Sequence, residues 1–338
     1  MSAKAQETSI RWGLLGASDV AATRMIPAMR RLGHRVVAVG SQTPEWAATY
    51  ADRHDIPAFG SVEEVIARDD VDAVYVSTLN ESHRGHTELA AAAGKHVLCE
   101  KPLALSVEDG RAMLLACERA GVILATNHHL PGSAIHRTIR HLVADGAVGR
   151  VLAVRVFHAV MLPERLQGWR LGSRAGGGVT LDITCHDASV LNPLLGALPT
   201  DVVAIAANQG PWGSAAEDAL MSTLRYADAT LVQTHDAFTV AHAPTGLHVL
   251  GSDGSIEADA AMDQGPVGSI MLRDSSGERE VEPEDRRDLY EINVAAFAAA
   301  LLGEGNPTAT GLDGLRAVQV ALAVREAAES GRRVSISE

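Results

Sequence analysis

The chain has 338 residues, of which 46% are hydrophobic, 21% are charged and 4% are aromatic. This length predicts about two domains, and the composition is that of a soluble globular α/β protein. The net charge of −13 argues against nucleic acid and membranes as partners, because anionic polymers and surfaces repel an acidic protein.

The cysteines and the N-terminal segment bear on the compartment. Cys99, Cys117 and Cys185 stand in apolar or helical contexts without paired spacing, which predicts reduced packing residues rather than a disulfide framework or a zinc motif. Residues 1–9 are short and polar, and no later apolar run is long enough to span a membrane. We therefore expect a cytoplasmic protein.

Strands and helices alternate through the first part of the chain. This alternation, with short connections, predicts a doubly wound parallel sheet of the Rossmann type. In such sheets ligands bind at the carboxyl ends of the strands. The predicted strands cover residues 10–16, 35–39, 72–77, 97–99 and 122–126. Their carboxyl ends carry Ser18, Ser41, Asn80, His83, Lys101 and Asn127.

The first strand ends in a glycine-bearing turn that leads into a helix. Exposed backbone N–H groups and the helix dipole can bind a pyrophosphate at such a turn. Against the dinucleotide pattern G-x-G-x-x-G, Ser18 replaces the second glycine and Ala21 the third. A turn that only packs is therefore the alternative, although the Ser18 hydroxyl can donate a compensating hydrogen bond. The cofactor-binding candidates here are Gly16, Ala17, Ser18, Asp19 and Val20.

The second strand ends where the adenosine ribose of a dinucleotide would lie. Ser41 and Gln42 stand where an NAD site usually carries Asp or Glu. Without that acid, hydroxyl and amide donors can hold a 2′-phosphate, which favours NADPH and leaves NADH possible at lower preference. No Arg or Lys lies between Gly40 and Asp52, and Trp46 offers only a face for stacking.

After Asn127 successive strands follow one another with few helices between them. This pattern predicts a second, α+β domain with a large, open and mostly antiparallel sheet. We predict a dinucleotide-binding domain at residues 1–127 and a substrate-binding and oligomerisation domain at residues 128–338. One face of the sheet needs a cover, so we expect a monomer, or a homodimer or tetramer formed through the sheet. The predicted elements are a helix at residues 133–145 and strands at 151–160, 202–208, 219–226, 231–238 and 247–250.

Two polar segments are candidates for catalysis. Glu100 and Lys101 directly follow a buried strand, so Lys101 is a candidate site residue, with an ordinary solvated lysine as the alternative. Asp182 and His186 follow three glycines and lie four residues apart on one predicted helix face. A buried Asp beside a His suits proton transfer, because the carboxylate can orient the imidazole and tune its pKa.

The Asp182 and His186 pair has two alternative interpretations. One is a hydrogen bond on the helix surface without chemistry. The other is a metal site, which would need His158 or His128 as a further ligand. Because the chain lacks the His-rich spacing of metal motifs, we expect no metal.

Three motifs in this order resemble the glucose-fructose oxidoreductase/inositol dehydrogenase (Gfo/Idh/MocA) family. They are Gly16-x-Ser18, Glu100-Lys101-Pro102, and Gly177-Gly178 followed by Asp182-x-x-x-His186. The resemblance covers nearly the whole chain and is strongest to bacterial keto-sugar reductases of the family. It implies NADPH-dependent reduction of a keto-sugar to the corresponding polyol by hydride transfer. Such reductases tend to carry an Arg at the position of Trp46.

The resemblance also implies roles for single residues. Lys101, Asp182 and His186 would form the catalytic group. The cofactor would further contact Thr78, Leu79, Asn80, His83, Glu100, Lys101, Asn127, Trp169, Arg170 and Tyr290. The sugar substrate would contact Lys101, His158, Trp169, Arg170, Asp182 and His186.

Two questions stay open at this point. His186, oriented by Asp182, is the predicted proton donor while Lys101 stabilises the carbonyl oxygen, but Lys101 itself could be the acid. Alternative functions are another sugar, inositol or dihydrodiol dehydrogenase, or a dinucleotide-binding regulator without catalysis. Retention of the three catalytic candidates argues against the regulator.

Overall fold

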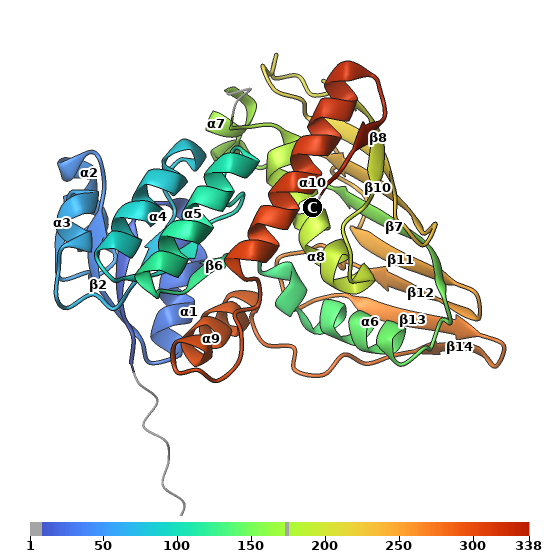
Figure 1. The fold of residues 1–338 in the computed structure, drawn as a ribbon, viewed down its shortest axis with the longest axis horizontal. Helices are drawn as coiled ribbons and strands as arrows, with labels where there is room; N and C mark the ends of the chain where they lie inside the picture. The colour runs from blue at the N-terminus through green and yellow to red at the C-terminus, as the bar shows by residue number, and fades with distance from the viewer. Residues whose placement is uncertain (1–8, 173–175, 338) are drawn as a thin grey trace, which may run out of the picture. The chain divides into compact units, whose positions relative to one another are not determined.

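The computed structural model describes residues 9–172 and 176–337 (Figure 1). The predicted polar N-terminal segment lies mostly outside these described residues. The chain divides into two compact units. Unit 1 holds the described residues up to Glu100 together with Arg111–Asn127 and Tyr290–Gly311. Unit 2 holds Lys101–Gly110, His128–Leu289 and the described residues from Leu312.

The two units bear on the predicted division at residue 127. They are not separated by one cut, because residues 290–311 belong to unit 1 and residues 101–110 to unit 2. Glu100, the last residue of one segment of unit 1, is followed directly by Lys101 of unit 2. The assignment of dinucleotide binding to residues 1–127 and of substrate binding to residues 128–338 stays a prediction.

Unit 1 contains a six-stranded sheet in the order β3-β2-β1-β4-β5-β6, with every pair of neighbouring strands parallel. This is the strand order of dinucleotide-binding folds, and it confirms the predicted doubly wound sheet. The apolar strand runs are buried between helices, as parallel strands require. The strands are β1 (Arg11–Leu15), β2 (Arg35–Gly40), β3 (Phe59–Gly60), β4 (Ala73–Val76), β5 (His96–Cys99) and β6 (Leu124–Thr126).

The helices of unit 1 bury an apolar core against this sheet. Trp12 of β1 stacks on Phe297 of α9 with ring centroids 5.2 Å apart, and both side chains are fully buried. Helix α9 was not predicted. The helices are η1 (Ala21–Met25), α1 (Ile26–Arg31), α2 (Pro44–Arg53), α3 (Val62–Ile66), η2 (Asn80–Ser82), α4 (His83–Ala92), α9 (Leu289–Leu301) and most of α5 (Val107–Ala120).

Unit 2 contains a nine-stranded sheet in the order β14-β13-β12-β11-β7-β10-β9-β8-β15. Only β7 and β10 pair in parallel among these described strands, so the predicted mostly antiparallel sheet is confirmed. Strands β12 to β15 were not predicted. The strands are β7 (Val151–Ala159), β8 (Asp201–Ala207), β9 (Ala219–Arg225), β10 (Leu231–Ala237), β11 (Gly246–Gly251), β12 (Gly254–Asp259), β13 (Ser269–Asp274), β14 (Gly277–Glu280) and β15 (Val334–Ser335).

Helices cover one face of this sheet. Figure 1 shows α6, α8 and α10 on the same side of the strands. The opposite face carries exposed apolar side chains, of which Ile205 is 79% and Met221 52% exposed. Oligomerisation through this face stays a prediction. The helices of unit 2 are η3 (Leu130–Gly132), α6 (Ala134–Ala144), η4 (Glu164–Leu166), α7 (Gln167–Gly172), η5 (Thr180–Thr184), α8 (Cys185–Leu195) and α10, which spans Gly311–Ser330.

Within the described ranges, no helix combines the length and the apolar character that a bilayer span needs.

Candidate active site

The glycine turn after β1 is built for close backbone packing. Gly16 has φ +112°, a conformation that favours glycine, and a Cβ there would lie 2.8 Å from backbone atoms of Ser77 and Thr78. Its N–H donates to the carbonyl of Gly40, at 2.9 Å. Gly16 therefore holds the turn against the ends of both neighbouring strands, β2 and β4.

The hydroxyl of Ser18 is used inside the turn. It donates to Ser77 Oγ at 2.8 Å and accepts from the N–H of Ala21 at 3.1 Å, which caps the following helix. The predicted hydrogen bond from this hydroxyl to a pyrophosphate is therefore not supported, since its only proton is already donated.

Helix α2 fixes the direction of the peptides in the same turn. Trp46 Nε1 donates to the carbonyl of Ala17 at 3.3 Å, and the Tyr50 hydroxyl donates to the carbonyl of Ser18 at 2.9 Å. In a trans peptide the N–H points away from the carbonyl. The N–H groups of Ser18 and Asp19 therefore point away from α2, and they are the anion donors that the turn can offer.

The end of β2 has small polar side chains. Ser41 Oγ accepts from the N–H of Thr43 at 3.2 Å, and Gln42 is exposed. Trp46 is 52% exposed while its Nε1 is anchored. This edge therefore offers neutral donors and an aromatic face toward a nucleotide.

The end of β4 is braced by two histidines of α4. His83 Nε2 contacts the carbonyl of Thr78 at 3.2 Å, and His86 Nδ1 contacts Thr78 Oγ1 at 3.0 Å. His83 is fully buried and Asn80 is 8% exposed, whereas Leu79 is 52% exposed. Of the predicted cofactor residues in this segment, Leu79 thus presents a side chain to solvent and His83 supports the backbone.

A buried hydrogen-bond network lies at the ends of β4, β5 and β6. The carboxylate of Glu100 accepts from the Tyr75 hydroxyl and from Asn127 Nδ2, and Asn127 Oδ1 accepts from Asn293 Nδ2. Burial, and then the negative charge of Glu100, raise the pKa of Tyr75 well above its ordinary value, so this hydroxyl stays a donor. Sequence analysis missed Asn293 of α9, which carries no motif.

Tyr290 lies in the core of unit 1. Its side chain is 2% exposed, and the guanidinium of Arg24 lies 5.8 Å from the centre of its ring. The predicted contact with a cofactor needs exposed surface, and Tyr290 has almost none. Its burial instead helps to anchor α9, which carries Asn293.

In unit 2, Lys101 is a buried ion-pair partner and not a solvated lysine. Its Nζ donates to Asp182 Oδ1 at 2.7 Å and to the carbonyl of Asp182 at 2.9 Å. Arg170 Nε donates to the other carboxylate oxygen of Asp182, at 2.9 Å. The side chains of Lys101, Asp182 and Arg170 are 13%, 9% and 19% exposed. Sequence analysis thus named all three residues but not the pairing of Arg170 with Asp182.

Asp182 stays ionised in this setting. Burial raises its pKa, but the charges of Lys101 and Arg170 and the hydrogen bonds from both outweigh burial and hold the pKa below its ordinary value. No hydrogen bond joins the Asp182 carboxylate to His186 among the described residues, so the predicted orientation of His186 by Asp182 is not seen. Asp182 lies in the π-helical turn η5, so the spacing of four residues does not stack it under His186 as in an α-helix, and the two cations occupy its oxygens.

Three buried histidines gather around His186. Its ring centroid lies 5.7 Å from that of His128, 5.1 Å from that of His129 and 6.2 Å from that of His158. Among the described residues, both ring nitrogens of His128 and Nδ1 of His186 are buried without a hydrogen-bond partner. Buried donors without partners are rare in native proteins, so these atoms mark a place where a polar ligand or water belongs.

Burial sets the charge of these rings. It lowers the pKa of His186 well below its ordinary value, and the charge of Lys101 and then the neighbouring imidazoles lower it further. Burial and Lys101 together lower the pKa of His128 to about 3. These imidazoles are therefore neutral at neutral pH, and Lys101 is the cation of the cluster.

Trp169 and Arg170 lie in α7, whose backbone is kinked at Gly168 (φ −25°, ψ −106°). The Arg170 guanidinium lies 4.6 Å from the centre of the Trp169 ring, a cation–π arrangement. Stacking and the bond to Asp182 hold the planar group of Arg170 in one orientation. Sequence analysis predicted both residues at the site, and the structure ties Arg170 to the Asp182 carboxylate.

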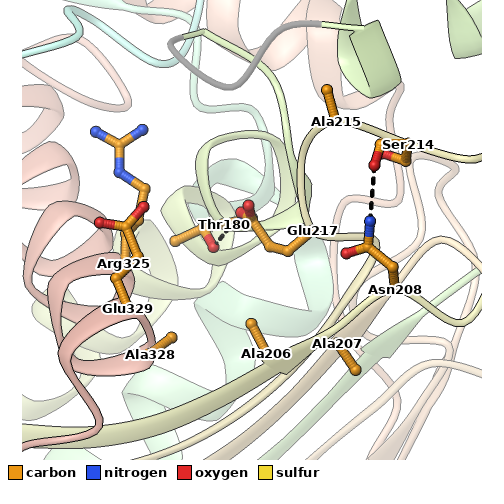
Figure 2. Close-up of a pocket in the computed structure, with 10 residues that line it drawn as sticks. All are labelled: Thr180, Ala206, Ala207, Asn208, Ser214, Ala215, Glu217, Arg325, Ala328 and Glu329. Atoms are coloured by element: carbon orange, nitrogen blue, oxygen red, sulfur yellow. Dashed lines mark hydrogen bonds between the residues drawn. The ribbon is translucent and has the colours of Figure 1, made fainter.

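A separate cavity of about 360 Å³ also lies in unit 2 (Figure 2). It contains none of the predicted substrate residues. One cation and two carboxylates line it, and Glu217 already accepts from the Thr180 hydroxyl at 2.6 Å. The described lining residues are Thr180, Ala206, Ala207, Asn208, Ser214, Ala215, Glu217, Arg325, Ala328 and Glu329.

The strand order and glycine turn of unit 1 define the class of fold, a Rossmann fold of the dinucleotide-binding type. The chain belongs to the GFO/IDH/MocA family. The family model described as "Oxidoreductase family, NAD-binding Rossmann fold" matches residues 10–128, and the model of the "GFO/IDH/MocA C-terminal domain" matches residues 136–257. The predicted resemblance to this family is therefore confirmed.

Individual relatives give a finer comparison. The chain is 48% identical to a 1,5-anhydro-D-fructose reductase of Ensifer adhaerens, over 96% of this chain and 98% of the relative. It is 29% identical to a D-xylose 1-dehydrogenase (NADP(+)) 2 of Haloferax volcanii, over 96% and 99%. Among solved structures, the aldose-aldose oxidoreductase of Caulobacter crescentus complexed with glycerol matches with a TM-score of 0.88 and 29% identity, covering 97% of this chain and 100% of that one.

Proposed function

We propose that this protein reduces 1,5-anhydro-D-fructose, or a closely related keto-sugar, to the corresponding polyol, 1,5-anhydro-D-mannitol, with NADPH as reductant. The identity of 48% to a reductase of that name, over nearly the full length of both chains, supports the substrate. The buried pair of Lys101 and Asp182, 2.7 Å apart, supports the reaction type and is the observation that carries the proposal.

The cofactor would be bound by residues of unit 1. The N–H groups of the turn after Gly16 would bind the pyrophosphate, and Ser41 and Gln42 would face the adenosine ribose. Ser41 and Gln42, directly after Gly40, are neutral, so the usual acid that would repel a 2′-phosphate is missing at this strand end. This supports NADPH, with NADH accepted less well. A bound nicotinamide supplies the hydride that the reaction requires at the carbonyl carbon.

Lys101 would supply the proton. As negative charge develops on the carbonyl oxygen, one N–H bond of the Lys101 ammonium breaks and an O–H bond of the product alcohol forms. The lysine is left as a neutral amine and regains a proton from solvent. Asp182 would keep Lys101 in place before the reaction, and Arg170 would keep Asp182 ionised.

His186, the proton donor predicted from the sequence, is less suited to this role. Its burial beside Lys101 holds its pKa well below the ordinary value, so that the imidazole has no additional proton at neutral pH. A neutral imidazole can still hydrogen-bond the reacting oxygen through its N–H. We therefore assign the acid to Lys101 and a hydrogen bond to His186.

The experiment is a cofactor-oxidation assay of the full chain. NADPH and, separately, NADH are offered with 1,5-anhydro-D-fructose and with a panel of ketoses, inosones and dicarbonyls. We expect the highest kcat/KM with 1,5-anhydro-D-fructose and NADPH. Higher kcat/KM for another carbonyl would identify a different sugar dehydrogenase, and binding of NADPH without any turnover would identify a dinucleotide-binding regulator.

A further inference from the structure

A buried chain of hydrogen bonds runs from the π-helical turn to His158. The Thr184 hydroxyl donates to Asp236 Oδ2, and His158 Nδ1 bonds Asp187 Oδ1 at 2.7 Å. Asp236 and Asp187 are both 0% exposed. Asp236 lies directly beside His158 because β10 and β7 pair in parallel in this register, and Asp187 reaches the pair from α8.

Asp187 and Asp236 form a buried pair of interacting carboxyl groups. Asp187 Oδ2 and Asp236 Oδ1 are buried without a hydrogen-bond partner among the described residues. Two carboxylates only accept, so a hydrogen bond between them requires one to be protonated. Burial raises the pKa of both carboxyl groups, and the charge of Asp187 raises that of Asp236 further. A proton on Asp236 leaves Asp187 as the acceptor.

This order of donors fixes the tautomer of His158. Because Asp187 can only accept, His158 must carry its proton on Nδ1. Burial lowers the pKa of His158 to about 4, so the ring is neutral and Nε2 is a bare acceptor. No hydrogen bond from Nε2 is found within the described ranges, and His158 keeps a small exposed fraction of 5%.

We propose that the protonated carboxyl pair Asp236–Asp187 positions His158 as a hydrogen-bond acceptor for a hydroxyl group of the substrate, and so selects polyhydroxylated ring ketones over ketones that lack a hydroxyl there. This inference deepens the proposed function and rests on it for the identity of the ligand. Asp236 and Asp187 touch His158 and not the substrate, so they are positioning residues. The other charged or titratable groups that act on His158 are Lys101, Asp182, Asp263, His136 and His186.

The test reads the tautomer directly by nitrogen NMR of the full chain labelled with ¹⁵N-histidine. The signals of His158 are identified by their loss in His158→Gln. In the wild type we expect Nδ1 protonated and Nε2 bare. Nε2 protonated instead, or both nitrogens protonated at neutral pH, would overturn the proposal without any reference to activity.

Three variants sharpen the reading. Asp236→Asn keeps an N–H donor toward Asp187 and should preserve the tautomer of His158. Asp187→Leu removes the acceptor of the Nδ1 proton, so His158 should no longer be held in that tautomer. Asp201→Asn, a buried carboxylate of the same sheet paired with Arg225, is the matched control and should not move the His158 signals. A changed tautomer in Asp236→Asn, or an unchanged one in folded Asp187→Leu, would contradict the proposal. If Asp187→Leu does not fold, the wild type and Asp236→Asn decide.

Activity provides a second readout. In Asp187→Leu, KM for 1,5-anhydro-D-fructose should rise roughly tenfold or more, as expected for an unpaired polar group in the complex, while NADPH binding is unchanged. Asp236→Asn should lose less than Asp187→Leu. An unchanged KM in folded Asp187→Leu would refute the role in substrate binding. A wild type that reduces no keto-sugar would refute the proposed function, while the NMR result would still decide the tautomer.

Discussion

The two units bury polar side chains in different ways. In unit 1, the polar groups at the strand ends bond to one another, as in the network of Tyr75, Glu100, Asn127 and Asn293. In unit 2, the cluster around His186 leaves ring nitrogens of His128 and His186 without partners among the described residues. A network in which every buried polar group has a hydrogen-bond partner holds the backbone rigid. Buried polar groups without partners lower the stability of the fold unless a ligand supplies the missing hydrogen bonds. This difference supports our proposal that unit 1 is the binding scaffold and that unit 2 carries the proton chemistry.

Removing the Lys101 ammonium should have the largest effect. Lys101→Met keeps the length of the side chain but removes the acid, so turnover should fall about 10³-fold while NADPH binding changes little. Steady-state assays and fluorescence titration with NADPH measure the two quantities. Lys95→Met is the control, because Lys95 is also hydrogen-bonded, to the carbonyls of Arg68 and Val71 in unit 1. Turnover of Lys101→Met near that of the wild type would exclude Lys101 as the acid.

Removing the central imidazole should have a smaller effect. His186→Ala takes away a hydrogen bond to the reacting oxygen, and we expect a loss of about 10²-fold in turnover with cofactor affinity nearly intact. Alanine at the exposed His141 of α6 should leave turnover unchanged. A His186→Ala enzyme as active as the wild type would remove His186 from the mechanism.

The buried groups of unit 2 should make the fold sensitive to acid. The folded-state pKa is about 3 for His128 and His136, about 4 for His158 and still depressed for His186, whereas in the unfolded chain it is about 6.5. Below about pH 6.5 the unfolded chain therefore binds four protons that the folded chain does not. The folded pair Asp187 and Asp236, with raised pKa values, holds one proton at neutral pH and binds a second below about pH 7. In the unfolded chain neither aspartate binds a proton above about pH 4.

The net excess of two protons on the unfolded chain means that stability falls as pH is lowered from about 6.5 to about 4. The expected slope is roughly 2 to 3 kcal/mol per pH unit, measured by urea unfolding at several pH values. His128→Gln should flatten the slope by about 1.4 kcal/mol per unit, and His242→Gln, at an exposed position, should not. A slope of zero in the wild type would contradict the neutral histidine cluster.

The smallest expected effect concerns unit 1. Trp46→Arg adds a cation near Ser41 and Gln42 and should raise the preference for NADPH over NADH by about fivefold or less, as for one exposed ion pair. Ratios of kcat/KM for the two cofactors measure it. Trp46→Phe, which keeps an aromatic face without the charge, is the control. An equal change in both variants would assign the effect to stacking.

Much of the fold could be predicted because its signals are local. Apolar strands such as β4 lie between helices and are buried along their whole length. Strand β14 was not predicted because its residues Gly277–Glu280 are polar and exposed. The sequence there has no alternation of apolar and polar residues. Helix α9 is apolar on most sides, which hides the helical period.

The candidate site was predictable where a motif carried it and not where two distant segments meet. Lys101, Asp182 and His186 stand in recognisable motifs, but the pairing of Asp182 with Arg170 instead of His186 depends on the π-helical turn. Asp236 was missed because only the register of β10 on β7 places it beside His158. Its one sequence signal is a charged residue at an inward position of an alternating strand, two residues after the buried Thr234.

The most direct test of the proposed reaction is to trace the transferred hydride. The enzyme is incubated with 1,5-anhydro-D-fructose and NADPH that carries deuterium at the transferable position of C4, and the product is examined by NMR. We expect 1,5-anhydro-D-mannitol with one deuterium at the former carbonyl carbon. A polyol without deuterium, or oxidation of NADPH with no polyol formed, would contradict the proposed reaction.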